Sequence, residues 1–252
     1  ALGDIFFTMS YLPHFLLERH VRNCVICVPS GVCRQVAELF GTYSVEVYAQ
    51  KELDELIQAC IYTGEENSYI AHQDRPYMVQ LHRALQIKCI PLETIYKCGV
   101  FGLPQKTKPY RPFRWEEYPA LNEIAPGKAV IFAPYAKSVT TFDEAFWKPI
   151  VADFQEQGYQ CFTNVAEDEK PLAGTRGISP RITQMKSVVQ RAGNFVGIRS
   201  GLCDVIRYAK CRKIALYPDY HYSDTKWKAI DMYAIDGWEN IVVDGDFVWN
   251  RI

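Results

Sequence analysis

The segment 194–211 contains the residues whose types and spacing point most directly to chemistry. Its apolar stretch 195–198 predicts a short strand, and the polar turn 199–201 leads into a helix that is expected to begin near Leu202. Such a junction directs free backbone N–H groups, and the positive end of the helix dipole, at one spot that favours an anion. The turn adds a guanidinium, a hydroxyl and a residue without a side chain, which are Arg199, Ser200 and Gly201. We interpret this turn as a binding site for a phosphate or diphosphate group. The alternative is that Arg199 pairs with a nearby carboxylate on the surface.

A second polar loop, 134–141, follows the apolar stretch 128–133, which predicts a buried strand. A lysine together with hydroxyl groups suits a diphosphate, through charge and hydrogen bonds. The residues of this kind in the loop are Lys137, Ser138, Thr140 and Thr141. The alternative is that one or both threonines only cap the following helix. Two such loops on one sheet support a diphosphate site more strongly than either loop alone.

Asp4 is the candidate for acid–base chemistry. The Gly3-Asp4 pair stands at the start of a helical stretch, where a carboxylate can act as a general base at an interface between domains. The alternative is a charge that only stabilises the N-terminus of the helix. Aromatic and polar side chains near strand ends are candidates for contacts with a sugar or a nucleoside; they are Tyr135, Asp204, Asp219 and His221. For the segment 219–224, the alternative is a solvated surface loop.

The composition is that of an ordinary globular protein, and it excludes two classes of function. Of the 252 residues, 48% are hydrophobic and 23% are charged, and the net charge of −1 provides no general basic surface for nucleic acid. No apolar run approaches the roughly 20 residues that span a bilayer. The sequence therefore excludes a membrane-embedded protein and permits at most peripheral contact with a membrane.

The nine cysteines are expected to be reduced thiols of a cytoplasmic protein. Their number is odd, no signal peptide lies within the chain, and most of them stand in apolar stretches. The pair Cys24-x-x-Cys27 lies in an apolar strand and lacks a second pair of ligands, so we interpret it as core filling. The histidines show no metal-ligand spacing either, and we predict no metal site.

The second half of the chain alternates strand and helix four times, which is typical of a parallel sheet with helices on both faces. Strands are expected at 128–133, 159–164, 195–198 and 213–218. One helix is expected to begin at Thr141 or Asp143, a second to run from 179 to 192 and end at Gly193, and a third to begin near Leu202.

The first half repeats this style, with helices expected at 5–19, 32–40 and 51–59 and strands at 24–28 and 44–48. It opens in a helix rather than a strand, so we expect residues upstream of Ala1 to be missing. The proline-rich stretch 104–127 resists both helix and sheet. We therefore predict two Rossmann-like α/β domains that face each other across a cleft, 1–110 and 128–252, joined by the linker 111–127.

With these positions identified, the chain resembles the heptosyltransferase-like glycosyltransferases of bacterial surface-glycan synthesis, which have two Rossmann-like domains in the GT-B architecture. The resemblance is weak over 60–110, and three segments carry it. The opening loop and helix of that group are similar to Gly3-Asp4 with the following IFFTMSYLPHFLLERH. Its donor loop and Trp-bearing helix are similar to PYAKSVTTFDEAFWKPIVADF. Its donor-diphosphate turn is similar to GIRSGLCDVIRYAKCRKIALYP. Arg199 replaces a usual acidic residue, Asp204 replaces a common histidine, and Lys137 lies earlier than the usual lysine. These departures leave the sugar open.

The resemblance implies an inverting, metal-independent glycosyltransferase without a cofactor. Asp4 would deprotonate the acceptor hydroxyl, while Lys137, Thr140, Arg199 and the amides of 200–201 would stabilise the diphosphate as charge develops on it. The implied partners are a nucleotide-sugar donor and a glycan acceptor in lipopolysaccharide or capsule synthesis, in the cytoplasm or at the inner face of the membrane. Two alternatives stay open: a non-catalytic nucleotide-sugar-binding protein, and a sugar-nucleotide epimerase on the same fold.

Overall fold

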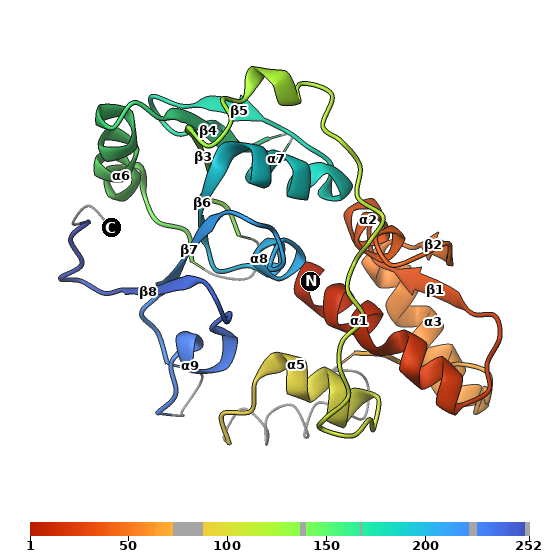
Figure 1. Cartoon of the computed structure of the whole chain (residues 1–252). Helices are drawn as coiled ribbons and strands as arrows, with labels where there is room; N and C mark the ends of the chain where they lie inside the picture. Colours follow the sequence, from red (N-terminus) through yellow and green to blue (C-terminus); the bar gives the residue numbers. More distant parts are fainter. Residues whose placement is uncertain (73–87, 137–139, 167, 222–225, 250–252) are drawn as a thin grey trace. The chain divides into compact units, whose positions relative to one another are not determined.

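The chain divides into two compact units, Ala1–Arg114 and Trp115–Ile252. The computed structural model describes residues 1–72, 88–136, 140–166, 168–221 and 226–249 (Figure 1). The boundary between the units falls inside the segment 111–127, which the prolines mark as a linker. This segment also contains a short 3-10 helix, η2 (Leu121–Glu123), which belongs to the second unit.

The second unit contains a parallel sheet of six strands in the order β5-β4-β3-β6-β7-β8. The strands are β3 (Ala129–Ala133), β4 (Gln160–Asn164), β5 (Arg176–Ile178), β6 (Gly193–Ile198), β7 (Arg212–Pro218) and β8 (Glu239–Val243). In chain order this is 3-2-1-4-5-6, the strand order of the Rossmann fold. It confirms the parallel α/β architecture predicted for this half. The direction of winding reverses between the neighbours β3 and β6, which form the topological switch point.

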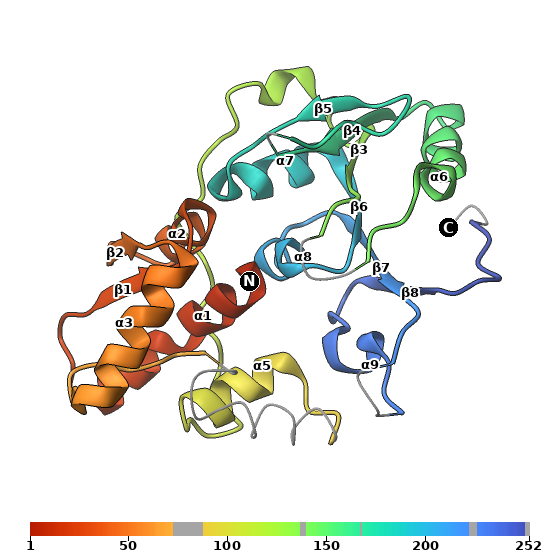
Figure 2. The ribbon, with the colours of Figure 1, turned by 180° about the vertical axis from the view of Figure 1, so that it is seen from behind.

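Helices cover both faces of this sheet because successive side chains along a strand point to opposite sides. On one face, Ile131 and Phe195 pack against α7 (Met185–Ala192) and α8 (Gly201–Val205). On the other face, Phe132 packs against Trp147 and Phe154 of α6 (Glu144–Glu156). Burying each of these side chains contributes about 1.5–3 kcal/mol. Figure 2 shows the sheet from behind, with α6 and α7 on opposite sides of it.

Four elements of this unit differ from the sequence prediction. The short strands β5 and β8 and the helix α9 (Ala229–Tyr233) were not predicted. The helix predicted over 179–192 begins later, as a 3-10 turn, η3 (Ile182–Gln184), that continues into α7. The three elements that were not predicted are short segments whose structure depends on partners that are distant in the sequence.

Gly193 ends α7, as the sequence predicted, and β6 begins at this residue, two positions before the predicted strand 195–198. It has a φ of +88°, in the left-handed region that favours glycine. A Cβ atom at this position would lie 2.9 Å from Cα of Gly127, the residue that precedes β3 by one turn. The Gly127 amide also donates to the Arg191 carbonyl at 2.8 Å. This hydrogen bond holds the backbone before β3 against the end of α7. Gly193 thus sets how closely α7 can approach the start of the central strand.

Gly193→Ala is expected to destabilise the second unit more than Gly158→Ala. Gly158 follows α6 with a φ of +78°, but a Cβ there would have no neighbour within 4 Å. The left-handed backbone alone costs about 1–2 kcal/mol for alanine, and overpacking against backbone adds about 1–3 kcal/mol at Gly193. Urea unfolding of both variants measures the difference. Equal losses of stability would show that the contact with Gly127 is unimportant.

The first unit is built around helix α1 (Leu2–Glu18), which is buried along most of its length. β1 (Val25–Val28) and β2 (Ser44–Val47) form a two-stranded parallel sheet, and α2 (Gly31–Glu38) packs against both strands. Helix α3 (Gln50–Thr63) follows, and later α5 (Leu92–Thr94) leads directly into a π-helix, η1 (Ile95–Val100). Among the described residues the sheet of this unit has two strands, so the full Rossmann arrangement is seen in the second unit alone.

The prediction that Cys24 and Cys27 fill the core is wrong for Cys27. Residues two apart in a strand share a face, and Cys27 is exposed on the same face of β1 as Val25. All nine cysteines are free thiols in the structure. Burial raises the pKa of Cys161 and of Cys211 to about 11, which keeps these two thiols protonated and unreactive at neutral pH.

Candidate functional site

Three polar turns begin on the same side of the six-stranded sheet, where neighbouring strands have their carboxyl ends. β3 leads into 134–141, β6 into 199–201 and β7 into 219–221. In register, Ala133 at the end of β3 lies beside Gly197, one residue before the end of β6. Because β3 and β6 flank the switch point, their turns begin where ligands bind in open α/β sheets. The fold thus places the starts of the two turns, after β3 and after β6, at neighbouring strand ends.

Thr140 and Thr141 are exposed, and neither of them caps the helix that follows. The N-cap of α6 is Asp143, whose carboxylate accepts a hydrogen bond from the Phe146 amide at 2.9 Å. The alternative in which a threonine caps this helix is therefore wrong. Both threonines remain candidates for binding a ligand beyond the end of β3.

Tyr135 lies at the start of the same loop and is half-buried. Its hydroxyl donates to the Lys170 carbonyl at 2.6 Å. Burial is the main cause that raises the pKa of Tyr135, so the phenol is neutral. Its ring remains a candidate contact for a sugar or a nucleoside. Lys137 and Ser138, the other predicted ligands of this loop, lie outside the described residues.

In the turn 199–201 after β6, Ser200 is the N-cap of α8. The serine side chain makes no capping hydrogen bond, and its carbonyl accepts the Cys203 amide at 3.0 Å. The amides of Gly201 and Leu202 stand in the first turn, where a helix has no carbonyl of its own to offer them. The Leu202 side chain is buried, so this residue can contact a ligand through its amide. α8 has five residues, and its dipole is correspondingly weaker than the sequence suggested.

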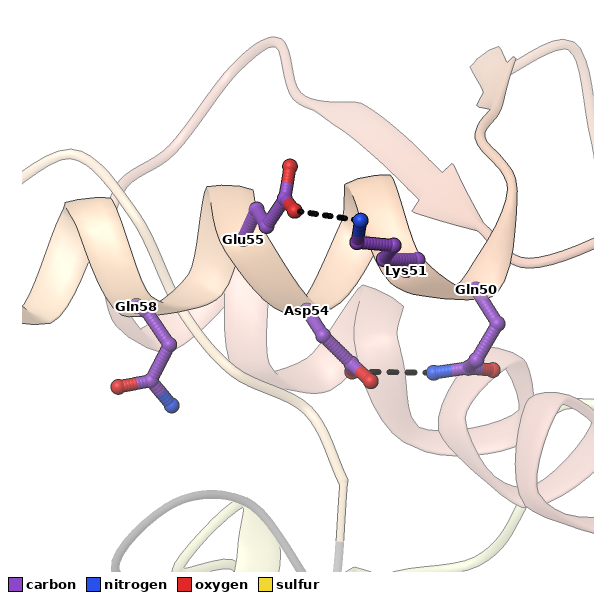
Figure 3. A pocket seen from close by; sticks show the side chains of 5 residues that line it. All are labelled: Gln50, Lys51, Asp54, Glu55 and Gln58. Carbon is purple, nitrogen blue, oxygen red and sulfur yellow. Dashed lines mark hydrogen bonds and ion pairs between the residues drawn. The ribbon is translucent and has the colours of Figure 1, made fainter.

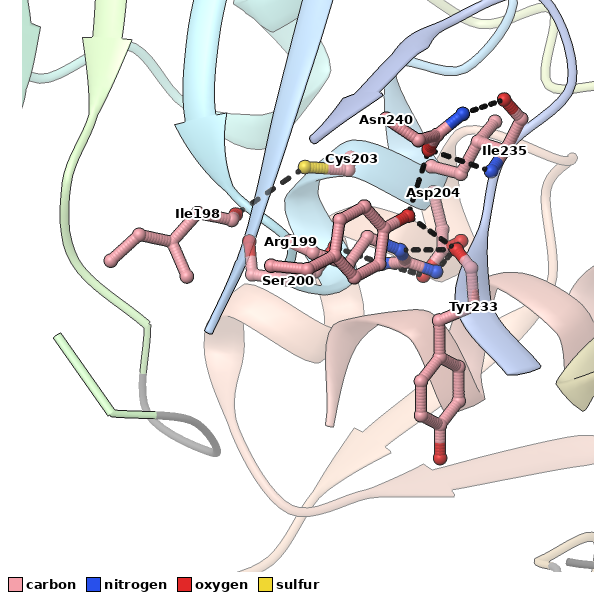
Figure 4. Close-up of polar contacts among 9 residues, drawn as sticks. Ile198, Arg199, Ser200, Cys203, Asp204, Tyr233, Ile235 and Asn240 are labelled. Atoms are coloured by element: carbon pink, nitrogen blue, oxygen red, sulfur yellow. Dashed lines mark hydrogen bonds and ion pairs between the residues drawn. The ribbon is translucent and has the colours of Figure 1, made fainter. Parts of the chain in front are cut away.

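Arg199 and Asp204 form a buried ion pair beneath this turn (Figure 4). Nη1 and Nη2 of the guanidinium donate to the two carboxylate oxygens at 3.0 and 2.7 Å, and the side chains are 9% and 3% exposed. Nε donates to the Tyr233 carbonyl at 2.8 Å, and Nη1 also donates to the Ser200 carbonyl at 2.5 Å. Burial lowers the pKa of Arg199, but the charge of Asp204 raises it, and the net shift is upward. The guanidinium is therefore permanently charged.

This geometry gives both residues protein partners, where the sequence predicted ligand contacts. Arg199 was expected to bind phosphate, and Asp204 was expected to contact a sugar or nucleoside. Both oxygens of the Asp204 carboxylate instead accept hydrogen bonds from the Arg199 guanidinium. All three nitrogens of that guanidinium donate to protein atoms. The alternative in which Arg199 pairs with a carboxylate is the one that the structure contains, although the pair is buried. We assign both residues a positioning role: they hold the 199–201 turn.

The ion pair belongs to a wider network that the sequence analysis missed. The Tyr217 hydroxyl lies 2.8 Å from the Tyr233 carbonyl and 2.9 Å from Oδ1 of Asn240. Asn240 in turn donates to the Ile235 and Trp238 carbonyls at 3.0 and 3.1 Å. The network connects the turn to β7, α9 and β8. Its partners are far apart in the sequence, and no local pattern marks Tyr233 or Asn240 as polar anchors.

Asp219 and His221 follow β7, at the strand end where they were predicted. Asp219 Oδ1 lies 2.8 Å from Nζ of Lys228, and this hydrogen bond is the main cause that raises the pKa of Lys228. His221 is exposed and pairs with Lys228 through an isolated antiparallel bridge. Their contact with a sugar or nucleoside stays a prediction. Residues 222–224 of this segment lie outside the described part of the chain.

Asp4 lies in the first turn of α1 and is 8% exposed. Its Oδ1 accepts the Tyr96 hydroxyl at 2.8 Å, and its Oδ2 lies 2.9 Å from the Ala1 nitrogen. In the same unit, the Tyr11 hydroxyl donates to Oε1 of Glu93 at 2.6 Å. The carboxylate of Asp4 is thus held by a side chain from a distant segment, which a purely helix-terminal charge would not need. Tyr96 is a further residue that the sequence analysis missed.

Figure 3 shows a hollow on the first unit that lies along one helix. Its lining residues all belong to α3: Gln50, Lys51, Asp54, Glu55 and Gln58. Their polar groups pair with one another along the helix, Lys51 with Glu55 at 3.8 Å and Gln50 with Asp54 at 3.0 Å. A surface lined by a single helix is no enclosed site.

In the described part of the chain, no group of three histidines, cysteines or acidic residues could hold a metal ion. Among the same residues, no helix is long and apolar enough to cross a membrane.

Three solved structures with a similar fold are glycosyltransferases. The chain matches a glycosyl transferase of family 9 from Veillonella parvula DSM 2008 with 12% identity and a TM-score of 0.61, over 96% of this chain and 83% of that one. It matches the E. coli ADP-heptose lipopolysaccharide heptosyltransferase II with 13% identity and a TM-score of 0.62, over 96% and 87% of the two chains.

A third similar structure is the E. coli heptosyltransferase WaaC with ADP-2-deoxy-2-fluoro heptose. It has 9% identity and a TM-score of 0.53, over 96% of this chain and 90% of that one. No protein-family model and no curated protein matches the chain. At these identities the likeness shows the fold. It confirms, at the level of fold, the resemblance to the heptosyltransferase-like group.

Proposed function

We propose that this protein is a glycosyltransferase that transfers a sugar from a nucleotide-diphosphate donor to a hydroxyl group of a glycan acceptor. The observation that carries the proposal is the pair of polar turns at the β3/β6 switch point of a Rossmann sheet. The likeness in fold to family 9 glycosyltransferases and heptosyltransferases supports it.

In this proposal the donor diphosphate binds between the two turns. Hydroxyl groups and amides bind its oxygens; they belong to Ser138, Thr140, Thr141, Ser200, Gly201 and Leu202. Lys137 adds a positive charge, while the pair of Arg199 and Asp204 holds the second turn in place. Tyr135, Asp219 and His221 stand near the sugar or the nucleoside. Donors that are fixed before the reaction stabilise the negative charge that develops on the leaving diphosphate.

Asp4 is the proposed general base. Its carboxylate takes the proton of the acceptor hydroxyl, whose oxygen forms a bond to the anomeric carbon of the donor sugar. The bond between that carbon and the diphosphate oxygen breaks, and the electron pair leaves with the nucleoside diphosphate. A single displacement of this kind inverts the anomeric configuration, and it requires the acceptor hydroxyl and the donor sugar to be held in line.

The proposed setting is lipopolysaccharide or capsule synthesis in the cytoplasm or at the inner face of the membrane, without a metal ion or cofactor. The names of two similar structures, which are heptosyltransferases, support the substrate class. Loops at the strand ends determine which sugar and which nucleobase the donor carries.

A nucleoside diphosphate is expected to raise the melting temperature of the protein. At a concentration of 100 times Kd, binding stabilises the folded state by about 2.7 kcal/mol, which corresponds to roughly 5–10 °C for a chain of this size. A thermal-shift series with UDP, GDP and ADP, and with CMP as a monophosphate, measures the effect. The double variant Thr140→Val/Thr141→Val is expected to respond less than the wild type.

Thr63→Val on α3 is the control for the valine substitutions, because Thr63 bonds only the preceding turn of its own helix among the described contacts. A donor site between the turns is contradicted if no diphosphate stabilises the wild type, or if the double variant responds fully. Product analysis then separates the alternatives. A binding protein gives no turnover, an epimerase changes the donor sugar without an acceptor, and a transferase releases the diphosphate as the glycan is extended.

A further inference from the structure

Tyr96 makes a buried contact with the proposed general base. Its hydroxyl donates to Oδ1 of Asp4 at 2.8 Å, across 92 residues of sequence. Tyr96 is completely buried and Asp4 nearly so, which limits competition from water for this hydrogen bond. Its ring also stacks on Phe7 of α1, with centroids 6.2 Å apart and planes 25° from parallel. Both the position of the hydroxyl and the plane of the carboxylate are therefore fixed.

The backbone that presents Tyr96 is unusual. The residue lies in the π-helix η1, where the Phe101 amide donates to the Tyr96 carbonyl at 3.0 Å, a bond between residues five apart. This segment buries three successive side chains, those of Ile95, Tyr96 and Lys97. π-helical turns are rare, and they are frequent at functional sites because they redirect side chains that a regular helix would place elsewhere.

We infer that Tyr96 is a positioning residue for Asp4, an inference that rests on the proposed function. In the transfer step the carboxylate must meet the proton of the acceptor hydroxyl as the oxygen attacks the anomeric carbon. Catalytic groups have to be held within about 0.5 Å and 10–20° of the productive geometry. A carboxylate without a partner rotates about its Cβ–Cγ bond. The Tyr96 hydroxyl holds Oδ1 against that rotation, while Oδ2 lies 2.9 Å from the Ala1 nitrogen. Tyr96 acts on the substrate only through Asp4.

Tyr96→Phe removes the hydroxyl and retains the ring. The kcat for transfer is expected to fall about ten- to a hundredfold, the change that the loss of one hydrogen bond to a charged group produces. The KM for the donor and the thermal shift with nucleotide are expected to stay at wild-type values, because Tyr96 acts on the base alone. Steady-state kinetics with varied donor and acceptor measure this separation.

Tyr11→Phe is the matched control. It also removes the hydroxyl of a completely buried tyrosine that donates to a carboxylate, in this case that of Glu93, within the same unit. It is expected to keep wild-type kcat at a temperature where circular dichroism shows both variants folded. An equal loss of kcat in the two variants would assign the effect to general loosening of the unit and overturn the inference.

The variants Asp4→Asn and Asp4→Asn/Tyr96→Phe complete the test. If the tyrosine acts through the aspartate, adding Tyr96→Phe to Asp4→Asn has no further effect on the residual rate. Losses that multiply, or full activity of Tyr96→Phe beside an inactive Asp4→Asn, would overturn the positioning role alone. Full activity of Asp4→Asn would instead overturn the base assignment within the proposed function, so the two failures are distinguishable.

Discussion

Asp204→Asn is expected to lower the free energy of unfolding of the second unit by about 3–5 kcal/mol, the loss found when one partner of a buried ion pair is removed. The substitution retains the shape of the side chain and removes its charge. It leaves the Arg199 guanidinium, which is 9% exposed, without a counterion. Because that group donates to the Tyr233 and Ser200 carbonyls as well, the turn and α9 are expected to loosen together.

Urea unfolding, followed by circular dichroism, measures this change, and the Arg212–Glu239 pair provides the matched control. It has the same two-pronged geometry, at 2.7 and 3.1 Å, and joins β7 to β8. Its side chains are 35% and 38% exposed, so Glu239→Gln is expected to cost under about 1 kcal/mol. A loss from Asp204→Asn no larger than that of Glu239→Gln would contradict the buried role.

The double variant Arg199→Met/Asp204→Leu separates positioning from ligand binding. Replacing a buried ion pair with apolar residues of similar size is often neutral or stabilising, so this variant is expected to unfold near the wild-type urea concentration. If it is still stabilised by a nucleoside diphosphate, the guanidinium is not a phosphate ligand. If it is folded and binds no nucleotide, the ion pair is needed in the donor site, either to hold the turn or to bind the phosphate.

The central sheet was predictable because its strands are covered on both faces. The segments 129–133 and 214–217 are continuous apolar runs, and such runs indicate strands that are buried on both sides. β5 and β8 lie at the two edges of the sheet, and β5 consists of Arg176, Gly177 and Ile178. A strand that is so short and polar has no local pattern; its neighbour β4 supplies the hydrogen bonds that make it a strand.

The candidate site was predictable in location and less so in the direction of its side chains. The turn 199–201 follows β6 at the carboxyl ends of the parallel strands, as the sequence predicted, and its ligand stays a prediction. Whether an arginine in such a turn faces a ligand or the protein depends on its partners. The Tyr233 carbonyl is 34 residues away in the sequence, and Tyr96 is 92 residues from Asp4. Contacts of this range follow from packing, which local patterns do not encode.

Asp4→Asn is expected to reduce the kcat for sugar transfer about 10²- to 10⁴-fold, the usual contribution of a general base. Asparagine has nearly the same size, and its side-chain oxygen can still accept the Tyr96 hydroxyl, but it cannot take up a proton at neutral pH. Nucleotide stabilisation is expected to stay at its wild-type value, because the proposed donor turns belong to the second unit. Steady-state kinetics and the thermal-shift series measure the two quantities separately.

Asp54→Asn is the control for the loss of a carboxylate from the first unit, because Asp54 lies on α3 and pairs along its own helix with Gln50. It is expected to keep full activity. An Asp4→Asn variant that unfolds in urea like the wild type and transfers sugar at the wild-type rate would show that another group takes the proton. A variant that loses nucleotide stabilisation together with activity would show that Asp4 acts on donor binding, and the kcat loss could then no longer be assigned to proton transfer.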